Sequence, residues 1–69
     1  MRTIHLNNGQ EFGTNTRDGG LFSRRTDGTW GQWKGNSQTP FFRDGRQFWA
    51  WLKRHYDFEK GTRLVRRDF

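Results

Sequence analysis

Hydrophobic and polar residues alternate near the start of the chain in a way that predicts a β-hairpin over residues 3–12. Two short alternating segments flank Asn7-Asn8-Gly9, where Gly9 can adopt the positive φ of a three-residue turn. Counting outward from that turn fixes the register, so one cross-strand pair is expected to be buried and the other exposed. The buried pair is Ile4 with Phe12, and the exposed pair is His5 with Glu11.

A second hairpin is predicted by Leu21–Thr26 and Thr29–Lys34, which flank Asp27-Gly28. Asp-Gly favours a two-residue type I′ turn, and that turn sets the register of the two strands. The resulting pairs are Thr26 with Thr29, Arg25 with Trp30, Arg24 with Gly31, Ser23 with Gln32, Phe22 with Trp33, and Leu21 with Lys34.

This register divides the second hairpin into two faces, because side chains alternate across a strand. The face suited to a core carries Phe22, Arg24, Gly31 and Trp33. The face expected to meet solvent or a ligand carries Leu21, Ser23, Arg25, Trp30, Gln32 and Lys34. Trp30 is therefore the tryptophan expected to be exposed, and the other three are expected in the core.

The segments on either side of this hairpin are predicted from their turn residues. Residues 13–20 are all polar or glycine and are expected to form an internal loop. A short third strand is expected from Gln38 to Phe42 or Arg43, at an edge of the sheet because Pro40 lacks a backbone N–H.

A helix is predicted to begin after Asp44, a good N-cap with Gln47 three residues later. Gly45 in the first turn weakens this start by up to about 1 kcal/mol. Gly61 is expected to end the helix, and residues 62–69 to form a last strand or a basic tail. The side chains expected to face the sheet are Phe48, Trp49, Leu52 and Tyr56.

Together these elements predict a small α+β fold in one domain over residues 1–69. An antiparallel sheet of three to five strands, with two hairpins, is expected to pack against one C-terminal amphipathic helix. A chain of 69 residues cannot bury two cores. The sheet residues expected in the core are Ile4, Phe12, Phe22, Trp33 and Phe42.

The composition narrows the classes of partner. Thirteen Lys and Arg against seven Asp and Glu give a net charge of +6, which favours a polyanion such as nucleic acid, or an acidic protein surface. The chain has no cysteine, which excludes disulfides, thiolate chemistry and cysteine zinc sites and suits the cytoplasm. No segment has the roughly 20 apolar residues of a membrane span, so we expect no membrane partner.

The candidate functional residues are basic and aromatic side chains of the second hairpin and the C-terminal segment. A two-stranded β-ribbon fits the major groove of DNA, where Arg and Gln contact base edges and Lys contacts phosphate. The same residues suit a single strand, whose bases would stack on Trp30. The residues predicted to bind nucleic acid are Arg24, Arg25, Trp30, Gln32, Lys34, Arg63, Arg66 and Arg67.

These residues also have an interpretation without a ligand. Arg25 stacked on Trp30 would be a cation–π pair on a solvated surface, and the C-terminal arginines are typical of a solvated tail or a charged edge strand. His5 with Glu11 is the nearest approach to a catalytic dyad, and we interpret it as a polar cross-strand pair. His55 is expected to be half-buried beside the apolar face of the helix. We therefore expect no enzyme, cofactor or metal site.

The segment Gly20–Trp33, with Phe41-Phe42 and the predicted helix from Phe48 to Tyr56, resembles DNA-binding domains built from a three-stranded sheet and one helix. Plant AP2 domains and the arm-binding domains of phage-type integrases have this architecture. In them the exposed sheet face enters the major groove, which would place Arg25, Trp30, Gln32 and Lys34 at the DNA. The aromatic-rich helix and the additional first hairpin depart from the family pattern.

The leading function expected from the sequence is non-enzymatic nucleic-acid binding, with DNA favoured over RNA. The alternative is a small accessory or inhibitor protein of phage or plasmid type, which binds a host protein with an acidic surface. Its anchors would be Trp30, Trp51 or Phe69 with neighbouring arginines. A steep salt dependence favours the first function, and a stoichiometric protein complex at high salt favours the second.

Overall fold

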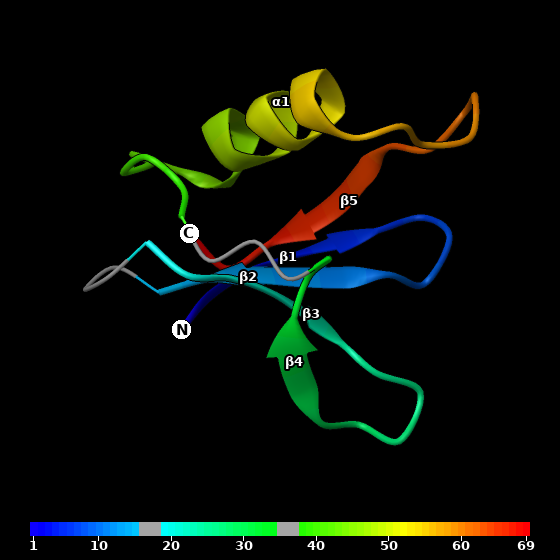
Figure 1. Cartoon of the computed structure of the whole chain (residues 1–69). Helices are drawn as coiled ribbons and strands as arrows, with labels where there is room; N and C mark the ends of the chain where they lie inside the picture. Colours follow the sequence, from blue (N-terminus) through cyan, green and yellow to red (C-terminus); the bar gives the residue numbers. More distant parts are fainter. Residues whose placement is uncertain (16–18, 35–37) are drawn as a thin grey trace.

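The fold is an antiparallel sheet with one helix packed on one of its faces (Figure 1). This computed structural model describes residues 1–15, 19–34 and 38–69. The elements are β1 (Arg2–Leu6), β2 (Glu11–Thr14), β3 (Leu21–Arg24), β4 (Trp30–Gln32), α1 (Gly45–His55) and β5 (Leu64–Arg67). The five strands lie in the order β4-β3-β2-β1-β5. The predicted α+β class is confirmed, and the helix is followed by a strand, which is one of the two alternatives expected for residues 62–69.

The first hairpin has the predicted register. Ile4 lies opposite Phe12 and His5 opposite Glu11. The N–H of Gly9 donates to the carbonyl of Leu6 at 3.1 Å, and Gly9 has a φ of 91°. This left-handed conformation at the third loop residue is the one that glycine adopts at little cost.

The register predicted for the second hairpin is wrong by one residue. The observed pairs are Arg24 with Trp30, Ser23 with Gly31 and Phe22 with Gln32. The loop has three residues instead of two, because the N–H of Arg25 donates to the carbonyl of Thr29 at 2.7 Å and the N–H of Gly28 to the carbonyl of Arg25 at 2.9 Å.

Asp27 explains why this loop has three residues. A type I′ turn needs a positive φ at both central residues, but within the described ranges only Lys34 among the non-glycine residues has one. Gly28 alone takes the left-handed conformation, with a φ of 89°. The Asp27 carboxylate instead accepts hydrogen bonds from the N–H and the hydroxyl of Thr29, at 2.9 and 2.7 Å.

The shift changes which side chains meet the helix, because a one-residue slip moves a strand's side chains to the other face. Leu21 was expected in solvent and is fully buried in the core. Phe22 was expected in the core and is half-buried on the opposite face of the sheet. Trp33 packs toward the helix as predicted, with its ring edge-on to Phe12 at 4.9 Å.

Two further segments differ from expectation. Residues 38–42 form no strand; the N–H of Thr39 donates to the carbonyl of Gly19 at 2.7 Å, and Phe42 is buried. Strand β2 continues to Thr14, so the expected loop at 13–20 begins two residues late, and its residues 16–18 lie outside the described residues.

Helix α1 begins as predicted and ends earlier. The Asp44 carboxylate accepts hydrogen bonds from the N–H groups of Arg46 and Gln47 at 3.0 and 3.1 Å. The helix ends at His55, not near Gly61, because Tyr56 is extended and the chain turns back to place Phe58 against the core. The Phe58 ring lies edge-on to Trp49 at 4.9 Å. The C-terminal segment forms β5, antiparallel to β1.

Gly45 lets the helix start close to the sheet. A Cβ on Gly45 would lie 2.9 Å from Cγ2 of Ile4 and 2.8 Å from Cβ of Arg67, closer than carbon atoms pack. The residue that weakens the helix locally thus allows the helix to cover the core. The buried hydrophobic residues are Ile4, Leu6, Phe12, Leu21, Phe42, Phe48, Trp49 and Leu52.

Candidate functional site

The face of the sheet opposite α1 is covered by no described helix or strand (Figure 1), and we call it the open face. A row of side chains crosses this open face. Strand register aligns one residue from each of the five strands in this row. From β5 to β4 they are Arg66, His5, Glu11, Arg24 and Trp30. The predicted pair of His5 with Glu11 thus belongs to a longer array.

Carboxylates pair with both arginines of this row. Nε of Arg24 lies 3.5 Å from Oε1 of Glu11, and Nε of Arg66 lies 3.3 Å from Oδ1 of Asp68. The His5 ring lies between the two acids, with Nδ1 3.3 Å from Oε1 of Glu11 and Nε2 3.3 Å from Oδ2 of Asp68. The charges on the open face are therefore largely balanced within the protein.

Asp68 and Trp30 complete the contacts of the row. The Thr3 hydroxyl donates to Asp68, and this bond, followed by the one from His5, holds the pKa of the Asp68 carboxyl below its usual value. At the other end, the Arg24 guanidinium carbon lies 5.0 Å from the centroid of the Trp30 ring. The expected cation–π pair exists, but Arg24 makes it in place of Arg25.

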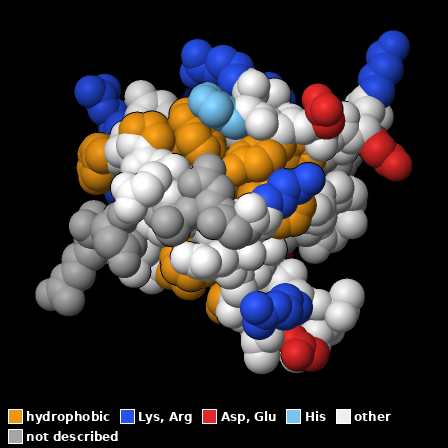
Figure 2. All heavy atoms as spheres, in the orientation of Figure 1, with side chains coloured by type: hydrophobic (Ala, Val, Ile, Leu, Met, Phe, Trp, Pro, Cys, Tyr) orange, Lys and Arg blue, Asp and Glu red, His pale blue; other side chains and the backbone are white. Residues whose placement is uncertain are grey.

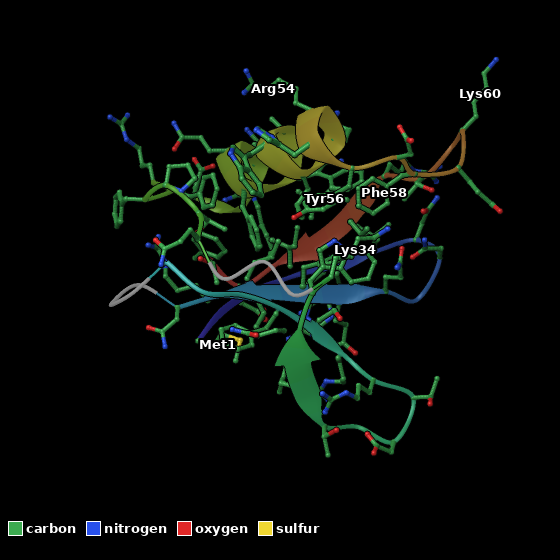
Figure 3. The ribbon with its side chains drawn as sticks, in the orientation of Figure 1. Met1, Lys34, Arg54, Tyr56, Phe58 and Lys60 are labelled. Atoms are coloured by element: carbon green, nitrogen blue, oxygen red, sulfur yellow. The ribbon has the colours of Figure 1, made fainter. Side chains whose placement is uncertain are left out.

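The structure does not bring the predicted ligand-binding residues of the second hairpin onto one face. Trp30 and Gln32 lie on the open face with Arg24, and Trp30 is half-buried there. Arg25 covers Gly31 on the other face, where a Cβ at position 31 would collide with its guanidinium. Lys34 follows β4 with a φ of 51°, and its ammonium lies 5.3 Å from the Trp33 ring centroid, on the helix side of the sheet (Figure 3).

The three predicted arginines of the C-terminal segment also diverge. Arg66 lies on the open face, whereas Arg67 aligns with Ile4 and packs against Gly45 at the start of the helix. Arg63 precedes β5 and its backbone N–H donates to the Asn7 side chain at 3.0 Å. Arg66 and Arg67 are successive residues of β5, so their side chains leave opposite faces of the sheet.

The outer face of α1 is the cationic surface that the sequence analysis did not single out. Arg46, Lys53 and Arg54 are exposed and fall within an arc of about 100° around the helix axis. Within the described ranges, none of the three has a carboxylate oxygen at ion-pair distance. We call these three residues the cationic stripe.

The sequence carries a signal for this stripe. The eleven residues of α1 include no Asp or Glu, and its last turn holds Lys53, Arg54 and His55. Figure 2 shows Lys and Arg side chains standing out from the part of the molecule where the helix lies, and Figure 3 shows Arg54 directed away from the sheet. The nearby Asp44 carboxylate is engaged by the helix N-terminus, whose N–H groups lower its pKa.

The described part of the chain carries no metal-binding cluster. No set of three His, Cys, Asp or Glu side chains there is arranged to hold a metal ion. His55 was expected to be half-buried and is exposed, with its ring stacked on Trp51 at 4.2 Å and its Nδ1 2.9 Å from the Trp51 carbonyl.

Comparison with known proteins adds no assignment. No family model matches the chain, and no curated protein or solved structure matches it. None of the helices in the described residues has the length and apolar character needed to cross a membrane. A function can therefore be inferred only from the positions and contacts of the described residues.

Proposed function

We propose that the protein binds nucleic acid without catalysing a reaction, and that the cationic stripe makes the first phosphate contacts. The observation that carries this proposal is that, among the described residues, no carboxylate oxygen lies at ion-pair distance from Arg46, Lys53 or Arg54. A surface cation without an ion-pair partner can bind a phosphate, and this binding releases a counterion from the nucleic acid. Arg46 and Lys53 are seven residues apart, about 10 Å along the axis, which allows contacts with separate phosphates.

The open face supports this ligand less well than the helix does. A phosphate that approaches Arg24 or Arg66 meets Glu11 or Asp68 at 3.5 and 3.3 Å from the guanidinium nitrogen. Like charges in such positions repel an anionic ligand. Trp30 and Gln32 on this face remain candidates for base contacts, and a preference for DNA over RNA remains part of the proposal.

The salt dependence of binding shows whether the cationic stripe or the open face contacts the phosphates. We would titrate fluorescently labelled DNA and RNA oligonucleotides with wild-type protein and with two double variants, Arg46→Ala/Arg54→Ala and Arg24→Ala/Arg66→Ala. Both variants remove two positive charges, so a change due only to net charge affects them alike. The logarithm of affinity is expected to fall linearly with the logarithm of salt concentration, and the helix variant should reduce that slope by about 1.4 to 1.8.

The sheet variant should leave the slope close to that of the wild type. Absence of binding by the wild-type protein at low salt would contradict nucleic-acid binding. Equal loss of slope in both double variants would contradict the assignment to the helix. We place this binding in the cytoplasm, on the basis of the cysteine-free composition.

One observation favours the second candidate, a protein partner of accessory or inhibitor type. Strand β5 lies at the end of the sheet, and a groove of about 250 Å³ runs between it and the helix. Such an edge can accept an added strand, and the basic lining suits an acidic segment. The groove is lined by Arg46, Leu64, Val65, Arg66 and Arg67. A stoichiometric complex captured from nuclease-treated lysate at high salt would support this function.

A further inference from the structure

Phe41 presents an aromatic ring to solvent from an anchored segment. Its side chain is 76% exposed, the largest value among the exposed large hydrophobic residues of the described ranges. On one side, the N–H of Thr39 donates to the carbonyl of Gly19 at 2.7 Å. On the other side, Phe42 is buried, with its ring stacked on Phe48 at 5.0 Å. The backbone around Phe41 is thus held while its ring remains accessible.

One guanidinium group, that of Arg2, lies over this ring. The Arg2 guanidinium carbon lies 5.3 Å from the Phe41 ring centroid and 4.2 Å from that of Phe69. Nη2 of Arg2 donates to the carbonyl of Arg43 at 2.9 Å, which ties the start of β1 to the segment before the helix. Arg43 is itself exposed and lies three residues before Arg46, the first residue of the cationic stripe.

We propose that Phe41 stacks on an unpaired base of a single-stranded nucleic acid whose phosphates follow the cationic stripe. This proposal rests on the proposed function and names its ligand class. An exposed ring beside a cation matches a ligand that offers a flat π-face and a negative charge in each repeating unit, as a nucleotide does. An acidic peptide segment offers the charge without a base. Duplex bases are already stacked, so an internal base pair leaves no face for Phe41.

The test separates stacking from phosphate attraction. We would measure binding to labelled oligo(dT), to an abasic oligonucleotide of the same length, and to a DNA duplex. The protein variants are Phe41→Ala, Phe41→Leu, which keeps an apolar side chain without a ring, and Phe41→Trp, which restores one. Thr26→Ala at the exposed tip of the second hairpin is the control, and thermal unfolding checks that every variant folds.

Phe41→Ala and Phe41→Leu are expected to weaken oligo(dT) binding about tenfold, with an unchanged salt slope. Phe41→Trp should bind oligo(dT) like the wild type, and no Phe41 variant should alter binding to the abasic strand. Unchanged oligo(dT) affinity in Phe41→Ala, an equal loss on the abasic strand, or wild-type preference for the duplex would each overturn the stacking proposal. Those results leave nucleic-acid binding standing, whereas failure of the wild type to bind all three probes at low salt would overturn both.

Discussion

The open face of the sheet and the outer face of the helix both carry arginines, but in different electrostatic settings. On the sheet, Arg24 lies beside the carboxylate of Glu11 in β2, and Arg66 lies beside that of Asp68, which directly follows β5. On the helix, Arg46 and Arg54 have no such partner among the described residues. The density of basic residues along the chain therefore does not identify the surface available to an anion. That surface is identified instead by the distance from each cation to the nearest carboxylate.

Removal of the core that joins the two faces should have the largest effect. Phe12 is fully buried between sheet and helix, with rings of Trp33 and Phe58 at 4.9 and 5.9 Å. Phe12→Ala should lower the free energy of unfolding by about 3–5 kcal/mol. Val65→Ala, at an exposed position, should change it by less than about 0.5 kcal/mol. Urea denaturation measures the free energy of unfolding of both variants. A loss in Phe12→Ala as small as that in Val65→Ala would contradict the described core.

A substitution at the contact between helix and sheet should have the next largest effect. Gly45→Ala improves the intrinsic helix propensity but places a methyl group against Ile4 and Arg67. We expect the clash to outweigh the gain in helix propensity and to lower the free energy of unfolding by about 1–3 kcal/mol. Arg54→Ala, at an exposed position of the same helix, is the control. A stabilised Gly45→Ala protein would show that the helix does not start so close to the sheet.

A fall in pH should weaken the contacts of the Asp68 carboxylate on the open face, without a direct effect on the cationic stripe. The pKa of Asp68 is lower in the folded protein than in the unfolded chain, because the Thr3 hydroxyl and His5 stabilise the charged carboxylate. Its contribution to stability is present above the unfolded pKa and is lost as pH falls through the folded pKa. Thermal melts should show Asp68→Asn less sensitive than the wild type to a fall in pH below about 4. Identical acid sensitivity of Asp68→Asn and the wild type would show that the Asp68 carboxylate does not stabilise the folded protein.

The two hairpins show what could be predicted from the sequence. The alternation around Asn7-Asn8-Gly9 and the glycine at the third loop position were sufficient for the first register. The second loop also ends in glycine, at Gly28, but Asp-Gly predicted a shorter turn. The hydrogen bonds from Thr29 to the Asp27 carboxylate, which belong to the three-residue loop, decide between the two. Local sequence thus predicted the strands of both hairpins but the register of the first hairpin only.

The candidate site shows the same limit more strongly. The N-cap and the residues buried by the helix could be predicted, whereas the cationic stripe on its outer face was not predicted as a binding surface. Its significance depends on where the carboxylates lie, and Glu11 and Asp68 reach the row on the open face from strands far apart in the sequence. Such pairing follows from sheet order, which hydrophobic periodicity does not determine.

NMR mapping of the bound surface tests the central claim most directly. Oligo(dT) would be added to isotope-labelled protein, and the shifts of backbone amides and arginine Nε–H groups would be followed. Changes concentrated in residues 41–55, with Arg46 and Arg54 foremost and Arg24 and Arg66 little affected, are the predicted result. Changes confined to β3, β4 and the arginines of the open face would contradict the account.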